Sequence, residues 1–251
     1  MGATHLLYHY QGRGRPIGGV KSYTEKVLGI ENANLIGYWP MNESSGAVAI
    51  NAQGVTARNG AYTGVTLGQT GIGDGNTCPL FDGANDYNHI YTTSLRDAFS
   101  ATAGTVAIWI KASGVGIWTD STARGLIRLH ATNQNQIYLF RTAVNNRITI
   151  RYEANNVDDS VDVDGITTTD WIPIAMTWNK TADQVIAYYN GSQTGATQTG
   201  LGVWAGSLAS ASTCIGALST APDGVWSGYL AHAAVWTKTL TAAQILALAT
   251  V

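Results

Sequence analysis

Short runs of alternating apolar and polar residues fill most of the chain between residues 35 and 235. In the run 105–111, Val106, Ile108 and Ile110 fall on one face, which is the pattern of a half-buried β-strand. The run 171–178 is apolar at every even position and predicts a second strand of the same kind. Further runs predict strands at residues 125–130, 136–141, 147–152 and 228–236.

Turn signals separate these runs. Asn190-Gly191 follows the run 184–189 and is the strongest two-residue hairpin signal, and Asn145-Asn146 predicts another turn. Pro173 predicts an edge or a bulge for its strand, because proline cannot donate to a strand ladder. The strands are short and no long helix intervenes. We therefore predict an all-β fold, a two-sheet antiparallel jelly-roll sandwich.

Two short helices are predicted near the ends of the chain. Ser22 and Glu25 form a capping box that opens a helix of about seven residues, ending near Gly29. Thr241 and Gln244 form a second capping box. The helix that follows has an apolar side for packing on the sandwich, and this side consists of Ile245, Leu246 and Leu248.

Residues 1–30 differ from the rest and are predicted to form an N-terminal arm with its short capped helix, ahead of a jelly-roll domain over residues 31–251. Glycine and proline prevent a regular helix within residues 12–19. Tyr8 and Tyr10 offer aromatic contacts, and Arg13 and Arg15 offer positive charge. We predict that these four residues bind a partner, so that the chain forms a homo-oligomer or part of a larger assembly.

Charge is sparse and unevenly spread. Charged residues make up 12% of the 251 residues, and the net charge is −2 at pH 7. Residues 1–26 carry four basic side chains and one acidic side chain, which suits an acidic partner. Four basic residues without a dense cluster do not predict nucleic-acid binding. No apolar run reaches the ~20 residues that span a bilayer, so we expect neither membrane insertion nor a signal peptide.

Two cysteines are too few for a disulfide framework or a zinc site. They form either one disulfide bridge or two buried free thiols, and we favour the free thiols. Five aspartates between residues 158 and 170 predict a solvated acidic edge, which discourages pairing between sheets of different molecules.

Several segments in a fixed order resemble one known family. Residues 37–46 (GYWPMNESSG), 81–87 (FDGANDY) and 107–111 (AIWIK) resemble the early strands and turns of laminin-G-like, concanavalin-A-like jelly-roll domains. Residues 171–191 and 228–248 are similar to the later strands and the C-terminal helix of these domains. The resemblance implies two curved antiparallel sheets of six or seven strands with a helix at the end.

The resemblance leaves function open, because lectins, glucanases, sialidase accessory modules and adhesive domains share this fold. An N-terminal arm and capped helix ahead of such a domain resembles bacteriophage virion proteins. We predict a non-enzymatic structural or adhesion protein in a virion, decorating the capsid or extending a tail or fibre, attached through residues 1–30. The alternatives are an extracellular carbohydrate-binding, lectin-like module that contacts cell-surface glycan and, less favoured, a glycan hydrolase.

The resemblance implies that a hydrolase of this superfamily carries two glutamates four residues apart on one strand, as a retaining mechanism requires. The chain has four glutamates, and none has that spacing. We therefore predict no catalytic residue.

The resemblance also implies a calcium site in many related domains, since hard cations bind carboxylate and carbonyl oxygens. Asp82 and Asp86 stand in matching positions, but Ala231 and Ala233 replace the family's later acids. The interpretation that we favour is that the two aspartates shape a turn by hydrogen bonds. We therefore expect no cofactor. A structural calcium ion is the alternative.

Eight tryptophans remain as candidate binding residues, and five of them fall on strand motifs, where we expect core or sheet-face positions. Trp118, Trp204 and Trp226 fall in loop-like segments. There a ring can stack on a sugar, anchor a protein interface or cover the end of the sandwich. We favour a role in a protein interface over a role in sugar stacking.

Overall fold

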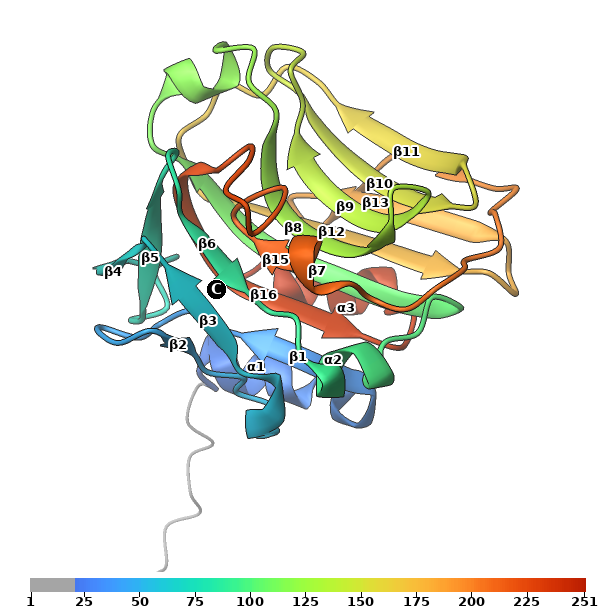
Figure 1. The fold of residues 1–251 in the computed structure, drawn as a ribbon, viewed down its shortest axis with the longest axis horizontal. Helices are drawn as coiled ribbons and strands as arrows, with labels where there is room; N and C mark the ends of the chain where they lie inside the picture. Colours follow the sequence, from blue (N-terminus) through green and yellow to red (C-terminus); the bar gives the residue numbers. More distant parts are fainter. Residues whose placement is uncertain (1–20) are drawn as a thin grey trace, which may run out of the picture.

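The computed structural model describes residues 21–251 and shows a sandwich of two antiparallel sheets, as predicted (Figure 1). Sheet A has the strand order β14-β13-β12-β7-β16-β5-β4, with β1 beside β16. Sheet B has the order β11-β10-β9-β8-β15-β6-β3-β2. In the described residues each sheet has eight strands, more than the six or seven expected. The expected number came from the family resemblance, and in sheet B the two-residue strands β2 and β15 raise the count.

The strands of sheet A are β1 (Leu35–Trp39), β4 (Thr66–Thr70), β5 (Thr77–Asp82), β7 (Ala103–Ala112), β12 (Ile172–Asn179), β13 (Gln184–Tyr189), β14 (Ser192–Gln198) and β16 (Ser227–Trp236). The strands of sheet B are β2 (Val48–Ala49), β3 (Gly60–Thr63), β6 (Tyr87–His89), β8 (Arg124–Thr132), β9 (Asn135–Arg141), β10 (Ile148–Ala154), β11 (Val157–Val163) and β15 (Cys214–Ile215). The helices are α1 (Tyr23–Gly29), α2 (Thr93–Ala98) and α3 (Ala242–Leu248).

The main core lies between the two sheets. Val106, Ile108 and Ile110 of β7 all point into it, as their alternation predicted. The even-numbered residues 172–178 of β12 lie in the same core, so this face is also confirmed. Trp39 of β1 is fully buried there and closes the core at the start of the domain.

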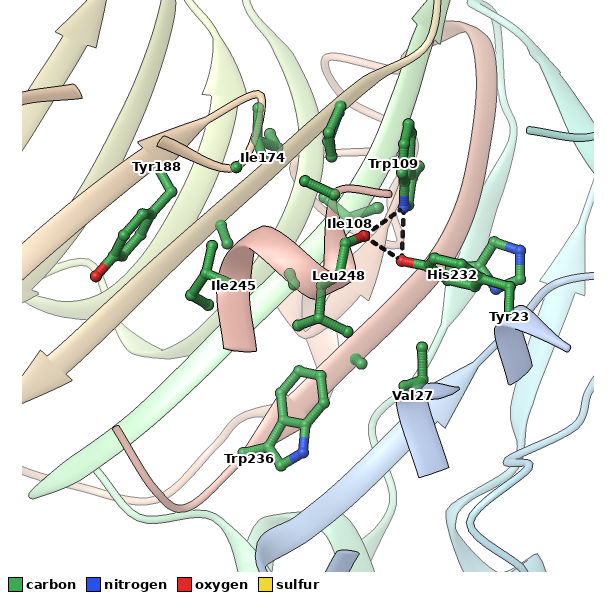
Figure 2. Close-up of a pocket in the computed structure, with 16 residues that line it drawn as sticks. Tyr23, Val27, Ile108, Trp109, Ile174, Tyr188, His232, Trp236, Ile245 and Leu248 are labelled. Atoms are coloured by element: carbon green, nitrogen blue, oxygen red, sulfur yellow. Dashed lines mark hydrogen bonds between the residues drawn. The ribbon is translucent and has the colours of Figure 1, made fainter. Parts of the chain in front are cut away.

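Helices α1 and α3 pack on the outer face of sheet A, where they cover a second apolar cluster (Figure 2). Both predicted capping boxes are present. Tyr23 of α1 donates a hydrogen bond to the carbonyl oxygen of Leu248 in α3 and accepts one from Nε1 of Trp109 at 2.7 Å. These bonds join the first described helix to the last, so α1 is an integral part of the packed fold.

The apolar side of α3 differs from the prediction in one residue. Ile245 and Leu248 are buried against sheet A, whereas the side chain of Leu246 is 54% exposed. Ile245 and Leu248 are three positions apart and share one helix face, from which Leu246 is rotated away.

A β-bulge in β16 places a histidine in a buried polar site. His232 has a φ of 53°, in the left-handed region, and lies where the pairing of β16 with β7 shifts register. On its other side, β16 pairs with β5 before the bulge and with β1 after it. His232 Nδ1 lies 2.8 Å from the hydroxyl of Tyr38, and Nε2 lies 3.1 Å from Oδ2 of Asp74 in the β4–β5 loop.

Pro173 does not mark an edge strand or a bulge. Strand β12 lies inside sheet A, between β13 and β7, and Pro173 is paired opposite Trp109 without a break in register. In a strand, the N–H and C=O of one residue point toward the same neighbouring strand, and the C=O of Pro173 points toward β13. It accepts there from the N–H of Asn190, in the predicted hairpin turn and beyond the last β13 pair. The position of the missing N–H therefore faces the turn, so the strand tolerates proline.

The cysteines are free and buried, as favoured from the sequence. Cys78 lies in β5 of sheet A and Cys214 in β15 of sheet B, so the two thiols belong to different layers. Burial raises the pKa of each thiol to about 12, which keeps both protonated at neutral pH.

Candidate functional site on the outer face of sheet B

Polar and aromatic side chains gather on the outer face of sheet B, over strands β8, β9 and β10. The aliphatic residues Ile127 and Leu129 of β8, Ile137 and Leu139 of β9, and Ile150 of β10 point into the core. Their neighbours in each strand therefore point outward. This surface is named the sheet B face, and it consists of Arg128, His130, Gln136, Tyr138, Phe140, Arg151 and Glu153.

Four side chains of the sheet B face are stacked across the strands. The rings of Tyr138 and Phe140 are nearly parallel, with an interplanar angle of 6° and centroids 3.9 Å apart. The guanidinium carbon of Arg128 lies 5.2 Å from the ring centroid of Tyr138, and that of Arg151 lies 5.4 Å from the ring centroid of Phe140. A cation over an aromatic ring contributes about 0.5–1 kcal/mol at a partly exposed site, so the two rings are held in place.

A row of hydrogen bonds runs beside this stack. Arg128 donates from Nη2 and Nε to Oε1 of Gln136, at 2.7 and 3.0 Å. Gln136 in turn donates from Nε2 to Oε2 of Glu153 at 2.8 Å. Arg128 also donates to the carbonyl oxygen of Leu218, in the loop that leads to β16. The row fixes the orientation of one amide and one carboxylate at the surface.

Acidic side chains of the edge strand β11 border the sheet B face. Asp158 Oδ2 lies 3.0 Å from Nη2 of Arg151, and Asp162 Oδ2 lies 2.7 Å from Nη1 of Arg147. Asp164 makes a second ion pair with Arg147 at 2.7 Å. The predicted acidic edge is therefore present on β11, except that Asp159 points inward and is only 4% exposed.

Three polar atoms of the sheet B face are buried and have no hydrogen-bond partner among residues 21–251. They are the hydroxyl of Tyr138, Nδ1 of His130 and Nε of Arg151. A buried polar atom without a partner costs about 1–3 kcal/mol, and such atoms in folded proteins are usually satisfied by water or by a ligand. These atoms are covered in the free protein, so a molecule that lies on the face can hydrogen-bond to them only after their side chains shift.

His130 and Tyr138 remain neutral near pH 7. Burial, followed by the positive charge of Arg128, lowers the pKa of His130. Burial raises the pKa of Tyr138. Nε2 of His130 donates to Oδ1 of Asn133 at 3.2 Å, so its free Nδ1 is an acceptor. The phenol hydroxyl of Tyr138 can both donate and accept.

The tryptophans predicted to form a surface platform are mostly buried. Trp118 and Trp226 are fully buried and pack against each other, with ring centroids 5.8 Å apart. Trp118 donates from Nε1 to the carbonyl oxygen of Thr168 at 2.7 Å. Trp204 is half-buried and packs on Phe99 and Tyr152. Trp118 and Trp226 are therefore core residues and not part of an exposed platform, which corrects the prediction for these two. For Trp204, which keeps part of its surface, the surface role stays a prediction.

The aspartates considered for calcium are turned onto backbone donors. Asp86 Oδ2 accepts from the N–H of Asp82 at 2.7 Å, and Asp82 Oδ1 accepts from the N–H of Ala84 at 2.8 Å. Among residues 21–251 no cluster of three or more His, Cys, Asp or Glu side chains is suited to hold a metal ion. The turn interpretation describes these bonds, whereas Oδ1 of Asp86 is buried and has no hydrogen-bond partner among residues 21–251. The structural calcium ion stays the alternative prediction.

The predicted partner-binding residues Tyr8, Tyr10, Arg13 and Arg15 lie outside the described residues. None of the helices in the described part of the chain is long and apolar enough to cross a membrane.

The sequence comparison places the chain in a family. Residues 82–246, more than half of the chain, match the family described as "Concanavalin A-like lectin/glucanases superfamily". The chain therefore belongs to this superfamily, and the family resemblance deduced from the motifs is confirmed. A search of curated proteins gave no match.

Solved structures with the same fold include carbohydrate-related proteins. Domain 4 of AbnA, an extracellular arabinanase from Geobacillus stearothermophilus solved with arabinotriose, is 14% identical with a TM-score of 0.63. The match covers 86% of this chain and 98% of that domain. A mutant Trypanosoma rangeli sialidase with trans-sialidase activity is 12% identical with a TM-score of 0.63, over 88% of this chain and 33% of the sialidase.

The receptor-binding domain of botulinum neurotoxin mosaic serotype C/D is similar over 87% of this chain, with 14% identity and a TM-score of 0.65. The chain spans about half of that domain's length, 51%. At such identities these similarities show a shared fold.

Proposed function

We propose that the protein is a carbohydrate-binding module and that the sheet B face binds an oligosaccharide. The observation that carries this proposal is the combination of a rigid aromatic pair with unpartnered polar atoms on one face. Sugars present apolar C–H faces, which pack on aromatic rings, and hydroxyl groups, which hydrogen-bond to planar polar side chains. The partly exposed ring of Phe140 serves the first need, since Tyr138, stacked on it, is only 7% exposed. The hydroxyl of Tyr138, His130 and Arg151 serve the second once their side chains shift.

The comparisons support this proposal at the level of the fold. The superfamily is named for lectins and glucanases, and domain 4 of AbnA was solved with a sugar ligand, arabinotriose. Because this chain covers nearly the whole of that domain, arabinotriose is a natural first ligand to test.

We propose that the protein binds the oligosaccharide without hydrolysing it. Glu153 and Asp158 stand opposite each other on β10 and β11, and a glycoside hydrolase needs a pair of carboxyl groups, one of which donates a proton. Here Glu153 accepts from Gln136, and Asp158 accepts from Arg151 and from Ser160. Both carboxylates are thus engaged by neighbouring donors, as in a recognition surface.

Attachment through residues 1–30 and location in a virion stay predictions. The four residues predicted to bind a partner lie outside the described residues, and the virion location rests on resemblance alone. The fold neighbours support the carbohydrate alternative instead, so we propose glycan binding as the main function, with an extracellular glycan as partner.

A glycan array followed by calorimetric titration tests the proposal. The wild type should bind a subset of oligosaccharides, and Phe140→Ala should weaken binding about tenfold, the loss expected for a central contact residue. The matched control is Tyr229→Ala, because Tyr229 lies on β16 of sheet A with the Lys111 ammonium 5.7 Å from its ring centroid. Equal losses for both variants, or no bound glycan, would overturn the proposal.

A further inference from the structure

Most charged groups around the sheet B face are already paired with one another. Between residues 120 and 170 the chain carries five arginines and no lysine. Arg147 is paired with Asp162 and Asp164, and Arg151 with Asp158. Arg124 and Arg141 are both paired with Asp120.

The remaining arginine, Arg128, is also engaged. Its guanidinium donates to Gln136 and to the carbonyl oxygen of Leu218, at distances of 2.7 to 3.0 Å. Every arginine in this part of the sheet therefore has an acceptor within the protein.

From this we infer that the sheet B face selects neutral oligosaccharides and rejects sugars that carry a carboxylate or a sulfate. The inference rests on the proposed function and specifies its ligand class. An anionic sugar needs a cation to offset the cost of removing its charge from water. On this face it would have to displace an aspartate from Arg147 or Arg151, or the side chain of Gln136 and a backbone carbonyl from Arg128. The four carboxylates of Glu153, Asp158, Asp162 and Asp164 would repel it.

The groups left free on the face suit hydroxyls. The hydroxyl of Tyr138 and Nδ1 of His130 are uncharged, and Nε of Arg151 is a single donor whose charge is already offset by Asp158. A sugar hydroxyl donates and accepts at the same atom, so it can bond to each of these groups without bringing a charge.

Removing one aspartate should change this selectivity. Asp158→Asn frees Arg151, and Asp162→Asn frees part of Arg147, because each aspartate is an ion-pair partner of that arginine. The matched control is Asp97→Asn, since Asp97 forms a comparable surface ion pair with Arg96 on α2, outside sheet B.

The experiment titrates the wild type and the three variants with neutral oligosaccharides and with uronate oligosaccharides of the same length, among them galactotriose and trigalacturonate. The wild type should bind the neutral set more tightly. Asp158→Asn should raise the affinity for the uronate set about fivefold, the size of one partly exposed charge pair, with Asp162→Asn acting in the same direction. Asp97→Asn should leave both affinities unchanged.

Uronates that bind the wild type as tightly as neutral sugars would overturn the inference and leave the proposed function standing. An unchanged preference in both Asp158→Asn and Asp162→Asn would also overturn it. If neither set bound, the proposed function would fail and the inference with it.

Discussion

Oδ2 of Asp74 lies 3.1 Å from Nε2 of His232, and the two side chains are only 2% and 1% exposed. Asn76 donates two further hydrogen bonds to Asp74, from its amide nitrogen Nδ2 at 2.6 Å and from its backbone N–H at 3.2 Å. This buried cluster ties the β4–β5 loop to the bulge in β16, next to the place where α1 packs.

The first prediction is a loss of stability in acid that depends on Asp74. Burial alone would raise the pKa of Asp74, but hydrogen bonds from His232 and Asn76 outweigh it and lower the pKa to about 2. A carboxyl whose pKa is lower in the folded state stabilises the protein above its unfolded pKa of about 3.9, and this contribution is lost as the pH falls toward 2.

We expect about 2 kcal/mol of unfolding free energy to be lost from this group between about pH 5 and pH 2. Urea unfolding of the wild type and of Asp74→Asn at several pH values measures it, and the variant should show a shallower acid slope. Asp97→Asn is the control, since Asp97 is 61% exposed. Parallel acid slopes for wild type and Asp74→Asn would contradict the prediction.

The second prediction concerns the hydrogen bonds that fix α1 to α3 and sheet A. Tyr23→Phe removes the hydroxyl that donates to Leu248 and accepts from Trp109. Both partners lose this bond but keep the one from Nε1 of Trp109 to the carbonyl oxygen of Leu248 at 3.2 Å. We therefore expect a loss of about 1 kcal/mol and faster hydrogen exchange at the amides of α1. In Tyr229→Phe, where the removed hydroxyl makes no hydrogen bond within residues 21–251, the same amides should exchange as in the wild type.

The third prediction separates a structural from a binding role for the loop tryptophans. Trp118→Phe removes buried volume and the hydrogen bond to Thr168, and should cost about 2 kcal/mol of unfolding free energy. Trp204→Phe should cost clearly less, because Trp204 is half-buried. Neither variant should alter glycan binding. Lost binding with unchanged stability in Trp118→Phe would restore the platform hypothesis.

The fourth prediction concerns the hairpin between β13 and β14. Gly191 has a φ of 79°, and a Cβ there would lie 2.7 Å from Cβ of Ala249 beside α3. We expect Gly191→Ala to destabilise the fold by about 1–2 kcal/mol, through the left-handed backbone and the clash. Gly114→Ala is the control, since nothing lies within 4 Å of its added Cβ. Equal melting temperatures of Gly191→Ala and Gly114→Ala in thermal unfolding would refute this account.

Local signals explain what could be predicted from the sequence. The alternation of Val106, Ile108 and Ile110 identifies a face because side chains of a strand point alternately to its two sides. The capping boxes at Ser22 and Thr241 were found because their partners lie three residues away. The family motifs supplied the order of the elements.

Contacts between distant segments could not be predicted from the sequence. The burial of Trp118 depends on Trp226, more than one hundred residues away, and the site of His232 depends on Asp74 and Tyr38. The sheet B face did have a signal: polar or aromatic residues in the opposite phase to Ile127, Ile137 and Ile150 in three successive runs. That signal becomes a site only once the pairing of β8, β9 and β10 is known.

The central claim is that an oligosaccharide binds on the outer face of sheet B. The most direct measurement is a map of backbone amide chemical shifts during titration with a bound neutral oligosaccharide, with arabinotriose as the first ligand. We expect the changes to cluster on β8, β9, β10 and the neighbouring β11. In Phe140→Ala they should need about tenfold more ligand, and in Tyr229→Ala they should match the wild type. Changes centred on the outer face of sheet A or on the loops that hold Trp118 and Trp226 would contradict the claim.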